Sequence, residues 1–289
     1  MLAIFLFMKQ LIINSVNVKG EITAQDSLIE KILSDSFTFH YIPNGTISRG
    51  KGSVKVYTDP NLKKLVQMEY PEAILSGDAD NRSYVVLCEY LMERERQDKL
   101  GICSISSSSV YKGDEGILFF GGATNLGKST CALELVDNGY TFFSDEKTLL
   151  NLEKGLMVGG SRGIPLRKEI IKKRFVNDPG SFKEIKCDEY KTPQVKLIIL
   201  PHLDHGLKEP IINPFAPLDL FWHLTKEFSR RIRGDTKFVN YFEYLLPSLD
   251  TEELAQKRIS ITKDFVKGVE GFYFQGNTNQ LVKFVKDRI

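Results

Sequence analysis

The 289-residue chain has few cysteines, a single tryptophan and almost no excess of charge of either sign. Its net charge of +2 gives no reason to expect nucleic acid or an anionic membrane as a partner. The four cysteines lie far apart and form no Cys-x-x-Cys pair: Cys88, Cys103, Cys131 and Cys187. This spacing argues against a structural zinc site or a disulfide framework, and it fits a reducing compartment, so we expect a cytoplasmic protein.

Long apolar runs are also missing. No stretch approaches the ~20 apolar residues of a membrane-spanning helix, so no membrane association is expected. The opening sequence MLAIFLFMK has a short apolar run without a preceding basic region or a following small-residue cleavage site. We therefore expect a first strand over residues 3–7 rather than a targeting segment.

The length predicts one large domain or two unequal ones. We place a β-rich N-terminal subdomain with a linking helix at residues 1–98, and a larger domain at residues 99–289. In the first part, alternation predicts strands at Leu11–Val16, Phe37–Ile42 and Gly52–Thr58, a turn at Pro43–Gly45, and a helix at Gln25–Leu33 with Thr23 as a possible N-cap.

The linking helix is predicted over Arg82–Asp98, where Tyr84, Leu87 and Leu91 have the spacing of one apolar face. The helix ends in the charged run ERERQDK. A solvated face is the preferred interpretation of that run, and a nucleic-acid patch is the alternative.

The second part alternates apolar runs with helical patterns. Small side chains predict a strand within Gly101–Tyr111, followed by a hairpin turn at Lys112–Gly116. Further strands are predicted at Ile117–Phe120, Tyr140–Phe143, Val195–Leu200 (ended by Pro201) and Phe272–Phe274, a hairpin at Leu149–Asn151 and Leu156–Val158, and helices at Cys131–Val136, Leu218–Arg231 (with Trp222 on its apolar side) and Thr278–Arg288.

The most informative stretch is Ile117–Thr130, ILFFGGATNLGKST. It has the spacing of a phosphate-binding loop, between an apolar strand and a helix, which is the context that this motif requires. Glycines allow a tight turn whose N–H groups point at phosphate oxygens, and the helix start adds further donors. The predicted nucleotide-binding residues are Gly122, Ala123, Thr124, Asn125, Leu126, Gly127, Lys128, Ser129 and Thr130.

Within this loop, Lys128 is expected to neutralise the β- and γ-phosphates, and the Ser129 hydroxyl to bind Mg²⁺. Asp145 and Glu146 end the strand that follows the loop helix. Acidic residues at such a strand end are placed to bind Mg²⁺ or to contact a substrate hydroxyl.

The region from Ser104 to Arg167 resembles the catalytic domain of HPr kinase/phosphorylase and its smaller relatives. The shared order is a small-residue strand, GILFFGGATNLGKST, YTFFSDE and GGSRGIPLR; the ending GFYFQGNTNQLVKFVKDRI is similar too. The resemblance implies an α/β phosphate-loop (P-loop) domain at residues 99–289 with a mixed central sheet, as in phosphoenolpyruvate carboxykinase. It also implies ATP and Mg²⁺ as cofactors and a possible homo-oligomer.

The resemblance implies that Asp145 is the catalytic acid/base, which takes the proton of an attacking hydroxyl. Glu146 stands where relatives have a second aspartate and is a candidate metal ligand with Ser129. Members of the resembling family carry a histidine before the glycine loop at a position that falls within Ser106–Ser109 here, with Ser106 preferred, and the signature segment of bifunctional HPr enzymes is not recognisable. The sequence therefore departs from the family at two points.

Arginines supply the remaining candidates. Arg162 and Arg167 could contact phosphates or the incoming substrate, because a guanidinium offers a planar fork to phosphate oxygens; a surface role is the alternative. Arg230, Arg231 and Arg233 could bind a phosphorylated or acidic partner, but a complement to the helix dipole is preferred.

The leading hypothesis is an ATP-dependent kinase that transfers the γ-phosphoryl group to a hydroxyl of a protein, peptide or small molecule, with Asp145, Lys128 and Arg162 as catalytic residues. The alternative is a nucleotide-binding sensor or scaffold without phosphotransfer. A carboxykinase-like enzyme is a weaker third hypothesis, because no metal-binding Lys/His set is recognisable. The sequence does not choose between ATP and GTP.

Overall fold

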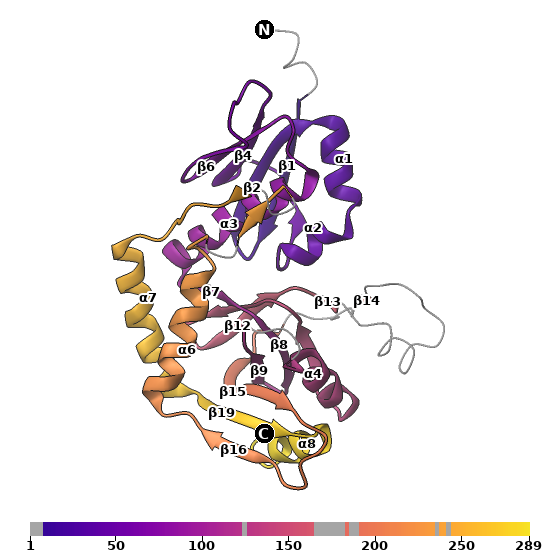
Figure 1. Ribbon diagram of the computed structural model, residues 1–289, viewed down its shortest axis with the longest axis vertical. Helices are drawn as coiled ribbons and strands as arrows, with labels where there is room; N and C mark the ends of the chain where they lie inside the picture. The colour runs from indigo at the N-terminus through magenta and orange to yellow at the C-terminus, as the bar shows by residue number, and fades with distance from the viewer. Residues whose placement is uncertain (1–7, 123–125, 165–182, 185–190, 235–236, 241–243) are drawn as a thin grey trace. The chain divides into compact units, whose positions relative to one another are not determined.

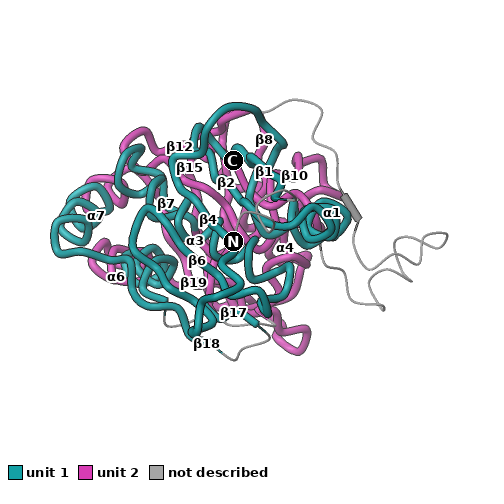
Figure 2. Tube along the Cα trace, turned by 90° about the horizontal axis from the view of Figure 1, so that it is seen from above, with its two compact units in different colours: residues 1–104, 225–262 teal, residues 105–224, 263–289 magenta. Residues whose placement is uncertain are grey.

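The computed structural model describes residues 8–122, 126–164, 183–184, 191–234, 237–240 and 244–289. The chain forms two compact units, and each contains two segments of sequence (Figure 2). Unit 1 consists of residues 1–104 and 225–262, and unit 2 of residues 105–224 and 263–289. The sequence suggested one continuous segment per domain, with a boundary at residue 98; here residues 225–262 return to unit 1.

Unit 1 is built on a six-stranded mixed sheet. Its strands follow the order β3 (Thr46–Ile47), β1 (Met8–Ser15), β2 (Val18–Gln25), β4 (Val54–Asp59), β6 (Glu72–Ser76), β5 (Val66–Glu69). β1 and β2 form a hairpin through Val16 and Asn17, which have positive φ angles. β2, β4 and β6 are parallel neighbours. The predicted strands at Leu11–Val16 and Gly52–Thr58 are thus confirmed to within a few residues, whereas residues 3–7 lie outside the described residues.

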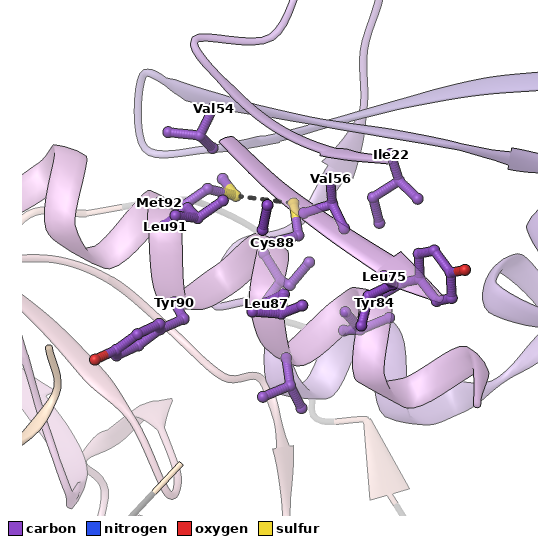
Figure 3. Packing of buried hydrophobic residues seen from close by; sticks show 14 of the residues in the cluster. Ile22, Val54, Val56, Leu75, Tyr84, Leu87, Cys88, Tyr90, Leu91 and Met92 are labelled. Carbon is purple, nitrogen blue, oxygen red and sulfur yellow. Dashed lines mark hydrogen bonds between the residues drawn. The ribbon is translucent and has the colours of Figure 1, made fainter. Parts of the chain in front are cut away.

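Helix α3 (Asn81–Leu100) packs on β2 and β4 and supplies one side of the core of unit 1 (Figure 3). Gly20 of β2 faces this helix so closely that an added Cβ would lie 2.3 Å from Cys88 Sγ. Apolar side chains of the sheet and the helix fill the contact, among them Ile22, Val54, Val56, Leu75, Leu87 and Leu91. The returning segment adds Ile232, Leu246 and Leu254 to the same core.

Two short elements differ from the sequence prediction. Phe37–Ile42, predicted as a strand, lies mostly in helix α2 (Ser36–Tyr41). Asp35 caps this helix by accepting a hydrogen bond from the Phe37 N–H at 2.9 Å, and the Phe37 and Tyr41 rings stack one turn apart. Six residues are too few for alternation to exclude a capped helix. Helix α1 (Asp26–Ser34) is confirmed, but its N-cap is Gln25.

Most of the charged run at the end of α3 is buried and only Lys99 is exposed, so the prediction of a solvated face is wrong. Arg96 is fully buried and pairs through Nη2 with Glu89 at 2.6 Å and with Glu93 at 3.0 Å. Gln97 donates to Glu93 at 2.9 Å and accepts from Arg258 of α7 (Glu252–Phe265) at 3.1 Å. Buried charges of this kind persist because partners neutralise them, and those partners lie far away in the sequence.

Unit 2 is built on a second mixed sheet, which agrees with the α/β prediction with a mixed sheet (Figure 1). Its centre is β15 (Gln194–Leu203), which runs parallel to β9 (Glu115–Phe120) and to β19 (Glu270–Gly276). The antiparallel pairs are β8 (Ser107–Lys112) with β9, β10 (Thr141–Ser144) with β8, β11 (Thr148–Asn151) with β12 (Leu156–Gly160), and β16 (Ile211–Pro214) with β19.

Two helices, α4 (Lys128–Asp137) and α8 (Thr278–Lys286), share one apolar cluster with this sheet. The cluster includes Ile117, Phe119, Cys131, Leu135, Ile199, Leu281 and Val285. The short strands β13 (Gly163–Ile164) and β14 (Lys183–Glu184) pair with each other. The first passage of the chain from unit 1 to unit 2 falls within β7 (Ile102–Ile105), the second within α6 (Pro217–Arg230) and the third within α7.

Two further predictions for the second part of the chain are corrected. Pro201 does not end its strand, because the pairing of β15 with β9 stops at Ile199 and a missing N–H is tolerated on that open side. Trp222 is 65% exposed, so it lies outside the apolar side of α6 (Pro217–Arg230); Leu220 and Leu224 are buried instead. The strand pair β17 (Phe238–Val239) and β18 (Tyr244–Leu245) follows α6.

None of the helices in the described parts of the chain combines the length and the apolar character needed to cross a membrane.

Candidate functional site

The glycine-rich stretch connects β9 to α4, as the sequence predicts. Gly121 and Gly127 both have φ angles in the left-handed range, +142° and +89°. A Cβ at Gly121 would lie 2.6 Å from Leu126, and one at Gly127 would lie 2.5 Å from Leu203. Glycine is therefore required at both positions for backbone conformation and for space. Gly122 is exposed, and Ala123, Thr124 and Asn125 lie outside the described residues.

Lys128, Ser129 and Thr130 form the first turn of α4 and are partly exposed. Gly127 is the N-cap of this helix, and in the part of the chain described here no side chain caps it. The N-terminal N–H groups of a helix that lacks such a cap remain donors for a ligand, and the helix dipole favours an anion there. The first turn of α4 thus has the chemistry that phosphate binding needs.

Asp145 lies directly after β10 and is only 1% exposed. Its Oδ1 atom accepts hydrogen bonds from the Ser129 hydroxyl at 2.8 Å and from the Ser108 hydroxyl of β8. The two serine oxygens are 3.3 Å apart. Residues from α4, β8 and the end of β10 therefore meet at one carboxylate oxygen, so the loop motif and the acidic motif are adjacent in space.

The second carboxylate oxygen of Asp145 is buried and has no hydrogen-bond partner among the described residues. Burial raises the pKa of Asp145, the hydrogen bonds from Ser108 and Ser129 lower it, and the negative charge of Glu146 raises it; the net direction is upward. A carboxylate with a raised pKa and an unused oxygen has the properties of a general base or of a ligand for a cation.

Backbone hydrogen bonds fix the turn that carries Asp145. Its N–H donates to Ser161 O at 2.9 Å, and the Lys147 N–H donates to Asp145 O at 2.7 Å. Glu146 has a φ of +59° and is exposed, whereas Asp145 is buried. The two acidic residues are neighbours in sequence but occupy different environments.

Ser108 was missed as a candidate because the serine run was interpreted as a strand of small residues, and only the position of the family's histidine was singled out within it. Successive residues of a strand face opposite sides of a sheet, which provides the signal. Ser108 faces Ser129 and Asp145, whereas its neighbours join a buried hydroxyl network, made of Ser107, Ser109, Ser144 and Thr148, with oxygen separations of 2.6–3.0 Å. The alternation within β8 thus separates one serine that contacts Asp145 from two that do not.

The remaining candidates vary in their relation to this site. The backbone oxygen of Ser106 accepts a hydrogen bond from the Gly121 N–H at 3.2 Å, so Ser106 lies beside the glycine loop. Arg162 follows Ser161, the residue that bonds to Asp145, and is partly exposed. Arg167 lies outside the described residues.

The donor set at Asp145 fits magnesium, although the described residues hold no cluster of three or more His, Cys, Asp or Glu side chains suited to a metal ion. Mg²⁺ is typically bound by one or two protein oxygens together with phosphates and water. The Ser129 hydroxyl and the unused Asp145 Oδ2 are such oxygens. Asp145 contacts Ser129 directly, which makes it a stronger candidate for this role than the exposed Glu146.

A scan of the chain against models of known protein families finds no match. A search of curated proteins finds no match either. Inference about function therefore proceeds from the residues and their geometry.

Proposed function

We propose that unit 2 is an ATP-dependent phosphotransferase that moves the γ-phosphoryl group to a hydroxyl. One observation carries the proposal: the Ser129 hydroxyl, within the GKS sequence of the glycine loop, donates to the buried carboxylate of Asp145 at 2.8 Å. A phosphate-binding turn and a carboxylate with a raised pKa are the two parts that such a reaction needs side by side.

In this proposal the N–H groups at the start of α4 and the Lys128 ammonium hold the triphosphate. The Ser129 hydroxyl would help to hold Mg²⁺, which neutralises charge on the β- and γ-phosphates when it is bound. Asp145 receives the proton of the acceptor hydroxyl, and its raised pKa brings its proton affinity closer to neutral pH, where a general base is most effective. Arg162 remains a candidate for contact with the transferred phosphoryl group.

The second candidate function is nucleotide binding without transfer, as in a sensor or scaffold. The observation in its favour is that Ser106 stands beside the glycine loop, where the resembling family has a histidine. A serine cannot supply the proton-transfer properties of an imidazole. In this alternative, Ser129 and Asp145 still bind the nucleotide, but no acceptor is phosphorylated.

The test is incubation of the full chain with γ-labelled ATP, Mg²⁺ and a native cell extract, followed by location of the label. We expect labelling of an acceptor, a loss of at least ~100-fold for Asp145→Asn with ATP binding retained, and ATP binding weakened ~10-fold or more for Lys128→Ala. Asp114→Asn is the matched control, because this aspartate is exposed in the β8–β9 turn. Binding without transfer to any acceptor supports the sensor, and normal transfer by Asp145→Asn excludes the proposed base.

A further inference from the structure

The basic residues at the end of α6 divide into paired and unpaired guanidinium groups. Arg230 donates to Glu227 at 3.0 Å, and Arg233 pairs with Asp250 at 3.2 Å. Arg231 makes no such contact: its Nε and Nη2 atoms are buried and have no hydrogen-bond partner among the residues that the structure describes. An unpaired buried charge is destabilising, so a ligand that pairs with it would be bound favourably.

A second cation lies close to Arg231. Lys237 donates through Nζ to the Tyr41 hydroxyl at 3.1 Å and lies over the Tyr41 ring. Burial and the positive charge of Arg231 lower the pKa of Lys237 to about 8. Glu89 and Glu93 oppose this shift, but both are already bonded to Arg96 in the core of α3. Glu227 acts in the same sense on Arg231, but it is paired with Arg230 at 3.0 Å. The two cations therefore repel each other, and each carboxylate named here is already paired with another arginine.

Hydrogen bonds hold the described backbone beside the two cations. The Lys237 N–H donates to Gly234 O at 2.9 Å, and the Leu246 N–H donates to Lys237 O at 2.9 Å. Gly234 has a φ of +78°, and a Cβ there would lie 2.1 Å from Leu246 O. The Tyr90 hydroxyl donates to Ile232 O at 2.6 Å. These contacts hold the described residues next to both cations, which lowers the entropic cost of binding a ligand there.

We propose that Arg231 and Lys237, together with the Tyr41 hydroxyl, form a binding site in unit 1 for a tetrahedral oxyanion such as a phosphate group. The Nε and Nη2 atoms of one guanidinium form the planar fork that binds two oxygens of a phosphate side by side. The Lys237 ammonium adds a point charge, and the Tyr41 hydroxyl can donate once the ammonium turns to the anion. The site is separate from the glycine loop, whose residues all belong to unit 2.

The first test uses sulfate as the probe, because it does not titrate near neutral pH. Binding to the full chain carrying Lys128→Ala, which weakens the glycine loop, is measured by titration calorimetry at pH 8 in two buffers of different ionisation enthalpy. We expect one saturable sulfate and the uptake of about half a proton, since Lys237 is about half ionised at this pH and the anion completes its protonation.

Variants assign the binding to these residues. Arg231→Met and Lys237→Met, each in the same background, are expected to weaken sulfate binding ~10-fold or more, and Lys237→Met also abolishes the proton uptake. Arg233→Met is the matched control, because this exposed arginine is paired with Asp250, which keeps Arg258 as a partner at 2.7 Å. The control should keep both the affinity and the proton uptake.

Thermal unfolding separates ligand binding from a structural role. Without sulfate, Arg231→Met should unfold at a higher temperature than its parent, because it removes an unpaired buried charge; with saturating sulfate the parent should be the more stable. If Arg231→Met does not fold, the unfolding temperatures of Lys237→Met and its parent, each measured with and without sulfate, provide the same test. The proposal is overturned if the parent binds no sulfate saturably, if both variants bind as the parent does, or if they lose equal stability with and without sulfate.

Two further probes identify the source of the anion. Inorganic phosphate and O-phosphoserine are titrated into the same Lys128→Ala chain. Tighter binding of O-phosphoserine supports a phosphate ester as the ligand, and equal or weaker binding supports the free anion; loss of both in Arg231→Met is expected in either case. These results do not depend on whether unit 2 transfers phosphate or only binds a nucleotide, because the chain used for the test already lacks Lys128.

Discussion

The hydroxyl of Ser129 donates to Oδ1 of Asp145 over 2.8 Å, and so connects the first turn of α4 to the end of β10 across 16 positions of sequence. Ser108 donates to the same oxygen from β8. The carboxylate is buried, and its other oxygen has no partner among the described residues. Several measurable properties of the protein should depend on this arrangement.

The pH dependence of stability should reveal the raised pKa of Asp145. A folded-state pKa above the unfolded value of ~3.9 makes the folded protein favour the protonated carboxyl, so this contribution is fully present below that pH and is lost as pH rises through the folded pKa. Asp145→Asn cannot ionise, so urea unfolding from pH 4 to 8 should give a flatter pH profile than in the wild type. Parallel profiles would contradict the raised pKa.

Ser108→Ala tests the hydrogen bond that opposes this shift. The Ser108 hydroxyl stabilises the ionised form of Asp145, so its removal should move the pKa of Asp145 further upward and extend the loss of stability to higher pH. Ser109→Ala is the matched control, because Ser109 bonds to Ser144 and Thr148 instead. An equal displacement of the pH profile in both variants would rule out a specific contact with Asp145.

The buried network of α3 should make Arg96 one of the most sensitive positions in unit 1. Arg96→Met leaves Glu89 and Glu93 without their shared cation, and such a loss typically costs about 3–5 kcal/mol. Urea unfolding measures this change in the free energy of unfolding. Lys99→Met removes the cation of the Glu95 pair, whose ammonium is exposed, and should cost less than ~1 kcal/mol. Similar costs for the two variants would contradict a buried network.

The same network should respond to acid. Burial opposes ionisation of Glu93, but the charge of Arg96 and the hydrogen bonds from Gln97 and Ser104 outweigh it and lower the pKa of Glu93 to about 2. Its stabilising contribution is therefore present above the unfolded pKa of ~4.3 and is lost as pH falls toward 2. Glu93→Gln should lose less stability than the wild type between pH 5 and 2.5; an equal or larger loss would contradict the lowered pKa.

Gly160 should tolerate no side chain. A Cβ at this position of β12 would lie 2.2 Å from Ser144 Cβ and 2.7 Å from Lys147 O, so Gly160→Ala should cost about 1–3 kcal/mol and displace the Asp145 turn. Thermal unfolding measures the cost. Gly268→Ala is the control, because nothing lies within 4 Å of its added Cβ and its φ is not in the left-handed range. A Gly160→Ala variant as stable as this control would show that β12 and the turn can separate.

Local patterns in the sequence predicted the elements that position the candidate site. The apolar run before Gly121 predicted β9, and the helical spacing after Gly127 predicted α4. The meeting of Ser108 with Asp145 could not be predicted in the same way, because strand pairing brings them together across 37 positions of sequence.

The errors have physical causes of the same kind. The ERERQDK run has the composition of a solvated face. In the structure, however, Arg96 donates a hydrogen bond to Ser15, 81 positions away, and Gln97 accepts one from Arg258, 161 positions away. Periodicity reports which residues of a helix share a side and does not report distant partners. Trp222 shows the converse: a large apolar residue in an amphipathic helix can remain exposed.

The return of residues 225–262 to unit 1 affects how the protein can be synthesised. A chain leaving the ribosome presents its first sheet early, yet Ile232, Leu246 and Leu254 of the same core emerge only after residues 105–224 have been translated. In a nascent chain that ends at Ser104, Gln97 would lack the hydrogen bond from Arg258, and part of the apolar core would be exposed to water. Unit 1 can therefore complete its folding only after residue 262 has been translated, and this delay should make its early segment a target for chaperones.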